Sequence, residues 1–301
     1  MQTTLRSGAI TIAAVSAGAV LMTSGAAPAP GPGPGPTRPA TITTAWTTAA
    51  RPTADRPVAA TRVSPLGTAH VRPGASSVNS LNSAGYAVSR ARTRFRLVRA
   101  TSFVPYLNCR LSPGSYSAGW VGLDGFVGTP DSAEQVGVAA NCTARRRAKY
   151  HAWFAMYPHA RTPLRVSVRA GDSVTASVYY DRSTAKFTLR LADNTTGGHA
   201  QVRAACPHGV RCPRDSAEII TSALTAGSGS RLTIRPLADY GAMSFTSIAI
   251  TDRSGDKGSV RSRHWGSTRI VETQRAAPFR VIARPTLVHG TTFATYWSRA
   301  R

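Results

Sequence analysis

The sequence predicts an all-β protein, an antiparallel β-sandwich of two sheets, and three observations support this prediction. Apolar or aromatic residues recur at every second position in many short segments after about residue 83. Clusters of Gly, Pro, Asp and Asn separate these segments at intervals of about ten residues. No segment carries a sustained apolar repeat of helical period. About 200 residues of this kind are enough for one domain with a substantial core.

The alternating segments can be taken in chain order, and each is expected to form a strand because its β-branched and aromatic residues suit a half-buried pleated sheet. The clearest of them cover residues 95–104, 149–157, 164–171, 172–181, 186–193, 217–224, 241–251, 279–288 and 291–297. Residues 170–197 are expected to form a hairpin of two strands that turns at "DRSTAK", residues 181–186.

One more alternating segment has an unusual polar residue. Val136 and Val138 share one predicted face, while Gln135, Gly137 and Ala139 share the other. The small residues of this second face leave room above the sheet. The amide of Gln135 would project into that room.

The first 80 residues are expected to lie outside the folded domain. Arg6, the apolar stretch 8–22 and the small residues that follow are typical of a secretory signal peptide, here residues 1–27. Residues 28–80 are rich in Pro, Gly, Thr and Ala, which predicts a disordered linker or pro-segment. Residues 81–301 then form the sandwich. We expect a secreted, extracellular protein with no membrane span in its mature form, because the apolar stretch is short for a bilayer.

The chain is strongly basic, with a formal net charge of +24 from 37 Lys and Arg against 13 Asp and Glu. Such a charge attracts nucleic acids, anionic polymers or acidic substrates. The arginines are scattered, apart from a run at residues 145–149, and no nucleic-acid-binding signature accompanies them. We therefore expect a solvated cationic surface and no specific nucleic-acid partner. Anionic cell-wall polymers are candidate partners.

Four cysteines fit an oxidising compartment. Cys206 and Cys212 bracket "PHGVR" and are expected to close a small disulfide loop, which leaves Cys109 to pair with Cys142. The alternative, a metal site that also uses His208, lacks a second ligand pair with zinc-site spacing. We expect no metal, no cofactor and no free thiol.

Common catalytic motifs are absent, since the chain has neither H-E-x-x-H nor G-x-S-x-G. None of the seven histidines has a context that marks a general base. Glu218 lies in an apolar strand, where a carboxylate is costly to bury unless it has partners or faces a wet groove. Alternatively, the strand that carries Glu218 lies at the edge of a sheet, where the carboxylate needs no special role.

Six segments in order resemble the glutamic peptidases, the eqolisins of peptidase family G. They are "WVGLDG" (120–125), "EQVGV" (134–138), "YHAWFAMYP" (150–158), "VRAGDSVTASVYYD" (168–181), "SAEII" (216–220) and "PLADYGAMSFT" (236–246). The resemblance covers roughly residues 80–297. It implies a concanavalin A-like, or lectin-like, sandwich with a groove on one concave face.

The resemblance also implies a catalytic dyad of Gln135 and Glu218, with Asp124, Trp120 and Trp153 near the groove. In such a dyad an ionised Glu takes a proton from a water that attacks the peptide carbonyl. The Gln amide orients the water and stabilises the oxygen that becomes negative. A Glu beside a Gln also avoids the repulsion between two close carboxylates. We expect a monomeric acid endopeptidase that acts on polypeptides.

Two positions depart from the family pattern. Ala155 stands where the family usually has Glu, and Ser83 stands where a Trp is common. These losses favour altered specificity or pH range, or a degenerate enzyme. One alternative function is therefore a non-enzymatic lectin-like sandwich that uses Trp120 and Trp153 to bind peptides or carbohydrates. Another is a glycosidase using Glu134 and Glu218, but Glu134 and its neighbour Gln135 should point to opposite faces of the strand.

Overall fold

A computed structural model of the chain describes residues 41–42, 76–126, 132–226, 233–274 and 280–299. All of them belong to one compact unit, which runs from Pro39 to Arg301. The predicted signal peptide and most of the predicted linker lie outside the described residues.

The described residues contain strands, turns and irregular segments and no helix, which confirms the all-β prediction. The strands are β1 (Thr41–Ile42), β2 (Ser76–Ser80), β3 (Ser83–Ser89), β4 (Phe95–Phe103), β5 (Tyr116–Leu123), β6 (Ala133–Cys142), β7 (Ala148–Tyr157), β8 (Thr162–Pro163), β9 (Ser173–Asp181), β10 (Lys186–Asp193), β11 (His199–Ala205), β12 (Ser216–Ser222), β13 (Thr225–Ala226), β14 (Thr233–Ile234), β15 (Ala242–Asp252), β16 (Lys257–Gly258), β17 (Gly266–Thr273), β18 (Val281–Pro285) and β19 (Phe293–Trp297).

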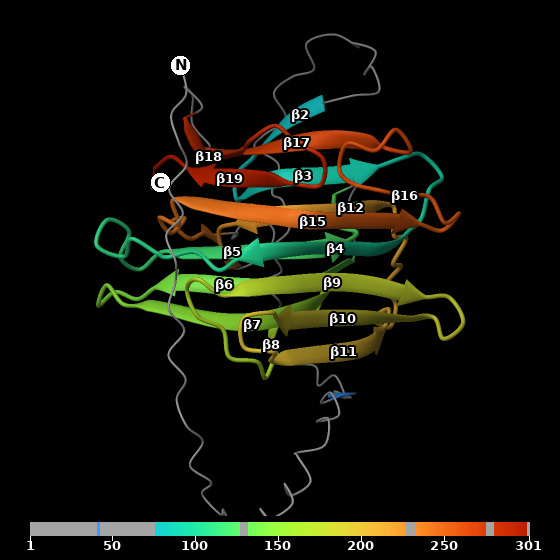
Figure 1. The fold of residues 1–301 in the computed structure, drawn as a ribbon, viewed down its shortest axis with the longest axis horizontal. Helices are drawn as coiled ribbons and strands as arrows, with labels where there is room; N and C mark the ends of the chain where they lie inside the picture. The colour runs from blue at the N-terminus through green and yellow to red at the C-terminus, as the bar shows by residue number, and fades with distance from the viewer. Residues whose placement is uncertain (1–40, 43–75, 127–131, 227–232, 275–279, 300–301) are drawn as a thin grey trace, which may run out of the picture. The chain divides into compact units, whose positions relative to one another are not determined.

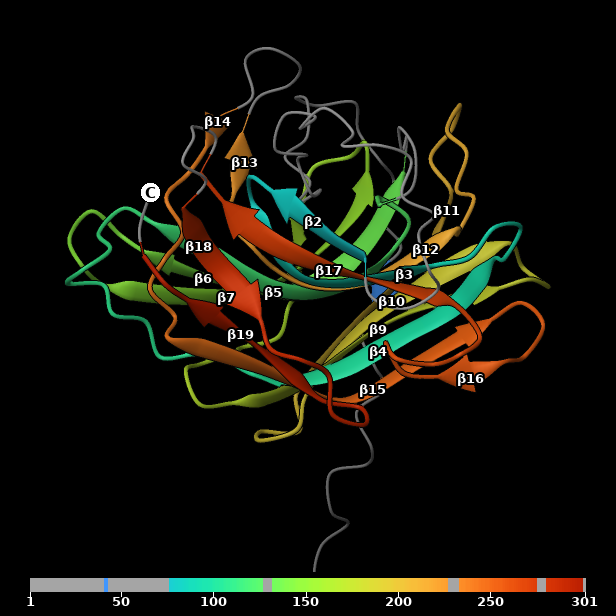
Figure 2. The same ribbon diagram turned by 90° about the horizontal axis from the view of Figure 1, so that it is seen from above.

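Strand pairing arranges the long strands in two sheets that are joined along one side. In the first sheet the order is β7-β6-β5-β12-β3-β17, and every one of these pairs is antiparallel. In the second sheet the order is β11-β10-β9-β4-β15-β19, also antiparallel. Strand β18 bonds to both β17 and β19 and so connects the sheets. Figure 1 looks through both layers, and Figure 2 shows one layer above the other.

Alternating side chains of the two sheets meet in one apolar core. Strand β10 shows the pattern clearly, since Phe187, Leu189 and Leu191 are buried and the residues between them are partly or fully exposed. The core also holds Phe245 and Phe293, whose ring centroids lie 5.2 Å apart. Burial of these large side chains, at roughly 25 cal/mol per Å² of apolar area, is the main force that holds the sheets together.

The opposite face of the first sheet carries a second, smaller apolar cluster. Its members come from all six strands of this sheet and include Trp120, Trp153, Ile220 and Ile270. A sheet of this kind normally presents a polar outer face. An apolar outer face on these strands therefore marks the side on which a site is to be sought.

Most of the predicted strands are present, including the β9–β10 hairpin, in which Asp181 pairs with Lys186. The predicted strand 164–171 is wrong, because these residues form an irregular segment after the short strand β8. Leu164 and Val168 are buried there, so the alternation reflects a loop packed on the core.

Two short strands precede residue 81, the predicted start of the domain. Ser76–Ser80 already form β2, which pairs with β17, and Thr41–Ile42 of the predicted linker pair with β11.

Two disulfides stabilise the connections between strands. Cys109 pairs with Cys142, and Cys206 pairs with Cys212, as the sequence predicts. The cysteines of "CPHGVRC" are therefore bonded to each other, which removes the alternative of a metal site built on them.

Candidate active site

Gln135 and Glu218 lie in one row across three neighbouring strands. Gly122 of β5 pairs with Gln135 of β6 on one side and with Glu218 of β12 on the other. Directly paired residues of an antiparallel sheet point to the same face. Two strand spacings place the backbones of Gln135 and Glu218 about 10 Å apart. Their side chains therefore rise from the same face with only a glycine between them.

Gly122 makes room for this arrangement. A Cβ atom at this position would lie 3.2 Å from Cγ of Gln135 and 3.0 Å from a ring atom of Trp120. No side chain fits there without displacing one of these neighbours. The sequence analysis did not single out Gly122, although a glycine inside an apolar strand often marks a close approach.

Asp124 forms the turn that follows β5 and has a positive φ of 61°. One of its carboxylate oxygens accepts a hydrogen bond from the backbone N–H of Asp215 at 2.9 Å. The other accepts a hydrogen bond from the hydroxyl of Ser132 at 3.3 Å. Ser132 directly precedes β6 and Asp215 directly precedes β12, so Asp124 ties together the three segments that carry the row.

The same turn also lies beside Glu218. A Cβ atom at Gly125 would lie 3.9 Å from Oε2 of Glu218, so the carboxylate sits next to the turn backbone. Both Gln135 and Glu218 are fully buried. In such a dry setting, hydrogen bonds and charges act more strongly than in water.

Trp120 and Trp153 lie in the next row on the same face. Gly137 pairs with both of them, and a Cβ atom at Gly137 would lie only 2.6 Å from Cβ of Trp120. The indole N–H of Trp120 donates a hydrogen bond to the hydroxyl of Ser222 at 3.0 Å. Trp120 and Trp153 are each 1% exposed, so both side chains are buried next to the row that holds Gln135 and Glu218.

Arg161 is a further residue of this face that the sequence analysis missed. Its guanidinium carbon lies 4.5 Å from the ring centre of Trp153 and 5.1 Å from that of Tyr116, and it donates a hydrogen bond to the Tyr116 hydroxyl. Burial lowers the pKa of Arg161 to about 9. Nothing in its local sequence marks it, because the loop after β7 brings it over Trp153.

Glu134 points to the opposite face of β6 from Gln135. It pairs with Leu123 and Met156, which belong to the core between the sheets. Glu134 and Glu218 therefore do not face one groove, and the structure gives no support to a glycosidase that uses this pair of carboxylates.

The two departures from the family pattern can also be located. Ala155 pairs with Gln135 and extends the row on the β7 side. Ser83 pairs with Ser222, the residue that accepts the Trp120 hydrogen bond. Ala155 thus adjoins the proposed dyad directly, whereas Ser83 lies beside the tryptophan row.

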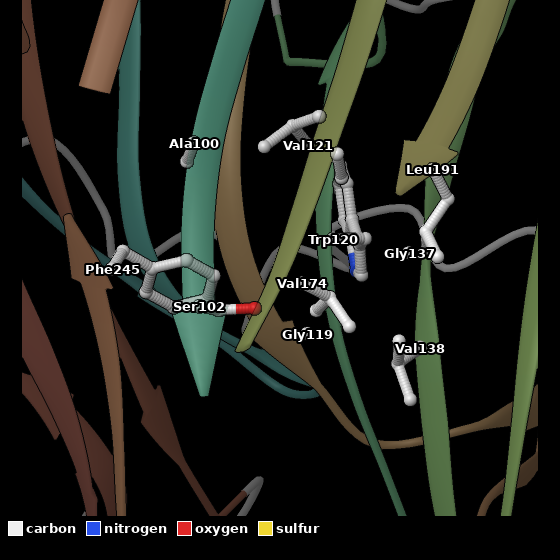
Figure 3. A pocket seen from close by; sticks show the side chains of 11 residues that line it. Ala100, Ser102, Gly119, Trp120, Val121, Gly137, Val138, Val174, Leu191 and Phe245 are labelled. Atoms are coloured by element: carbon white, nitrogen blue, oxygen red, sulfur yellow. The ribbon is translucent and has the colours of Figure 1, made fainter. Parts of the chain in front are cut away.

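The cavity shown in Figure 3 is lined in part by Trp120 and Gly137 of the tryptophan row. It lies between the two sheets, where Gly119 and Val138 of the first sheet face Ala100, Val174 and Phe245 of the second. The residues of the dyad row do not line it.

The described part of the chain contains no group of three or more His, Cys, Asp or Glu side chains that could hold a metal ion. It also contains no helix long and apolar enough to cross a membrane.

Comparisons with known proteins identify the family and the fold of the chain. Residues 81–290 match the Peptidase A4 family. The structure is similar to a scytalido-glutamic peptidase solved with a peptide-based transition-state analogue, with a TM-score of 0.61, 22% identity, and coverage of 72% of this chain and 98% of that chain. SCP-B, an eqolisin solved with the tripeptide Ala-Ile-His, gives a TM-score of 0.57 at the same identity and coverage.

A third similar structure is the aspergilloglutamic peptidase from Aspergillus niger. It has a TM-score of 0.50 and 22% identity, and the match covers 61% of this chain and 99% of that chain. No curated protein sequence matches the chain.

Proposed function

Because the chain belongs to the peptidase A4 family, the glutamic peptidases, and is therefore a peptide-bond hydrolase, we propose that Gln135 and Glu218 form its catalytic dyad. One observation carries this proposal. The two residues occupy one row on one face of the first sheet, with Gly122 as their common partner.

The proposed reaction begins with a water molecule held between the two head groups. The carboxylate of Glu218 takes one proton from this water, and the hydroxide that forms attacks the carbonyl carbon of the peptide bond. The carbonyl π electrons move to its oxygen. The resulting tetrahedral intermediate carries a negative oxygen, to which the NH₂ group of Gln135 donates a hydrogen bond.

The second step uses the same proton. Protonated Glu218 donates it to the amide nitrogen while the carbon–nitrogen bond breaks, which releases an amine and a carboxylic acid. Glu218 is then a carboxylate again, and the dyad is restored. No cofactor is needed, because the water supplies both the oxygen and the proton.

We also propose that the enzyme acts in acid solution and outside the cell. Gln135 is neutral, so it can sit beside the ionised Glu218 without the repulsion that a second carboxylate would cause. The secretory N-terminal pattern and the two disulfides suit an oxidising, extracellular compartment. The excess of positive charge would favour contact with anionic cell-wall polymers.

The dyad is tested by single substitutions measured on an acid-unfolded protein substrate. We expect Glu218→Gln to lose at least about 10³-fold in kcat and Gln135→Ala about 10²-fold or more, because the first removes the base and the second the oxyanion donor. Activity should persist with pepstatin and with chelators.

Matched controls guard against loss of folding. Glu272→Gln changes a buried glutamate of β17 outside the dyad row, and Gln201→Ala changes a glutamine of β11 in the second sheet. Both should retain activity. Undiminished hydrolysis by either folded dyad variant would reject the proposed roles.

A non-enzymatic peptide or carbohydrate binder is the second candidate function, and the replacement of the family's glutamate by Ala155 next to Gln135 favours it. It predicts tight binding by the wild-type protein with no turnover at any pH. Proteolysis that depends on Glu218 would exclude it.

A further inference from the structure

The sandwich contains a buried carboxyl that the proposed reaction does not use. Glu134 adjoins Gln135 in the chain, points into the core, and is 0% exposed. Its direct partners in the sheet, Leu123 and Met156, are apolar. An ionised carboxylate in such a place carries a large desolvation penalty, so the position favours the protonated acid.

Asp124, the residue that ties the three segments of the site together, lies close to Glu134 along the sheet. It directly follows Leu123, the β5 partner of Glu134, and it accepts a hydrogen bond from Ser132, two residues before Glu134. Burial raises the pKa of Glu134 well above its ordinary value, and the nearby charge of Asp124 raises it further. Neither carboxylate oxygen of Glu134 receives a hydrogen bond from the described residues. Burial likewise raises the pKa of Asp124 to about 6, although hydrogen bonds from the Arg214 and Asp215 backbone oppose the shift.

The remaining charged groups around the pair are few among the described residues. Glu218 of β12 adds negative charge near Glu134, and Asp215 adds negative charge near Asp124. The guanidinium of Arg214 contributes positive charge at Glu134 and stacks at 3.6 Å on the ring of Tyr180 of β9. The apolar neighbours of Glu134 on β5 and β7 add no charge.

We propose that Asp124 and Glu134 share a proton and act as a positioning pair that keeps the dyad aligned in acid solution. This inference rests on the proposed function of Gln135 and Glu218. In the protonated pair, the carboxylic acid of Glu134 donates a hydrogen bond to the carboxylate of Asp124. Asp124 still accepts the hydrogen bonds from Asp215 and Ser132.

Loss of the shared proton leaves two negative charges buried side by side. Like charges in a medium of low polarity repel strongly, and neither can be solvated where it lies. Separation of the pair moves the turn that bears Gly125, which abuts Glu218, and it moves β6 next to Gln135. Both halves of the dyad are therefore displaced by the loss of one proton.

The test compares wild type with Glu134→Gln between about pH 3 and pH 8, a range that spans the usual carboxyl pKa and its raised values. The glutamine keeps a donor for Asp124 but does not titrate. Two quantities are measured at each pH: kcat/KM on a denatured protein and the thermal unfolding midpoint. Asp181→Asn is the control, since Asp181 ends β9 in the second sheet and hydrogen bonds from Ser183 lower its pKa.

We expect Glu134→Gln to shift the alkaline limb of the activity profile to higher pH by about one unit or more. We also expect the unfolding midpoint of this variant to fall less steeply as the pH rises than that of wild type. Above about pH 5, Asp181→Asn should change neither, because the lowered pKa of Asp181 confines its effect on stability to more acid solution. If Glu134→Gln does not fold, Asp124→Asn takes its place, because it removes the other charge of the pair.

An alkaline limb and an unfolding profile identical to those of wild type would overturn the positioning pair. The unfolding profile also separates the two proposals. If no variant cleaves any substrate, the proposed function fails, and the difference in unfolding midpoint still decides whether the pair shares a proton. A shifted midpoint with an unshifted activity limb would reject the link between the pair and the dyad.

Discussion

At the scale of single residues, the site depends on the absence of a side chain between two polar ones. Gln135 and Glu218 could face each other across β5 only if the residue between them were small, and Gly122 meets this condition. The Gln135 amide thus has a position that suits the oxyanion donor that the family resemblance implies. The carboxylate it accompanies is the proposed base.

Gly122→Ala should reduce activity more than stability. The new Cβ would lie 3.2 Å from Cγ of Gln135, so we expect it to displace the amide and to lower kcat/KM by about 10- to 100-fold, since small misplacements of catalytic groups have effects of this size. The control is Gly198→Ala, whose Cβ would lie 3.2 Å from Val166, in the turn between β10 and β11 of the second sheet. Equal losses of activity in the two variants would argue against a special role for Gly122.

At the scale of elements, the site strands are held by pairing, by the Asp124 turn and by a disulfide. Cys109–Cys142 anchors the end of β6 to the loop before β5 and spans 33 residues of sequence. Cys206–Cys212 spans only 6 residues and closes a loop between β11 and β12. A longer closed loop restricts the unfolded chain more, so the first bond should stabilise the fold more.

Replacing both cysteines of each pair by alanine tests this difference. From loop length alone, the free energy of unfolding should fall by about 4 kcal/mol without Cys109–Cys142 and by about 2 kcal/mol without Cys206–Cys212. Urea unfolding of the two double variants measures both values. A larger loss for the short loop would contradict the loop-length argument.

The sequence predicted some elements and could not predict others, for identifiable reasons. Period-two alternation located strands such as β10, where one face is core and the other solvent. The same alternation misled at residues 164–171, because a loop that packs Leu164 and Val168 on the core shows the same pattern.

For the site, the family resemblance singled out Gln135 and Glu218, but their alignment through Gly122 depends on strand register, which local sequence does not fix. The opposite orientation of Glu134 followed from strand alternation. Its burial beside Asp124, in contrast, depends on contacts between distant segments. Arg161 was missed for the same reason, since a loop places it over Trp153.

At the scale of the whole molecule, buried acids link stability to pH. The unfolded Asp124 carboxyl releases its proton near pH 3.8, whereas the folded one keeps it up to about pH 6. Between these values the folded state binds more protons, so stability falls as the pH rises. Glu134 extends the loss to higher pH. Asp193 acts in the opposite sense: burial alone would raise its pKa, but hydrogen bonds from Thr196 and Thr195 lower it.

The free energy of unfolding should therefore be greatest near pH 4 and fall by about 3 kcal/mol or more by pH 7, with Asp124 alone accounting for about 3 kcal/mol. Below pH 4 it should fall again as Asp193 is protonated. Denaturant unfolding at intervals of one pH unit measures this curve. A free energy of unfolding that rises from pH 4 to pH 7 would contradict the assignment of the raised pKa values.

The central claim is that one amide and one carboxylate act together on a single water. It is tested most directly by kcat/KM in acid solution for Gln135→Ala, Glu218→Gln and the double variant. Groups that act as a unit are not additive, so we predict that the double variant is no slower than Glu218→Gln alone. Full activity in either folded single variant, or losses that simply multiply in the double variant, would contradict the account.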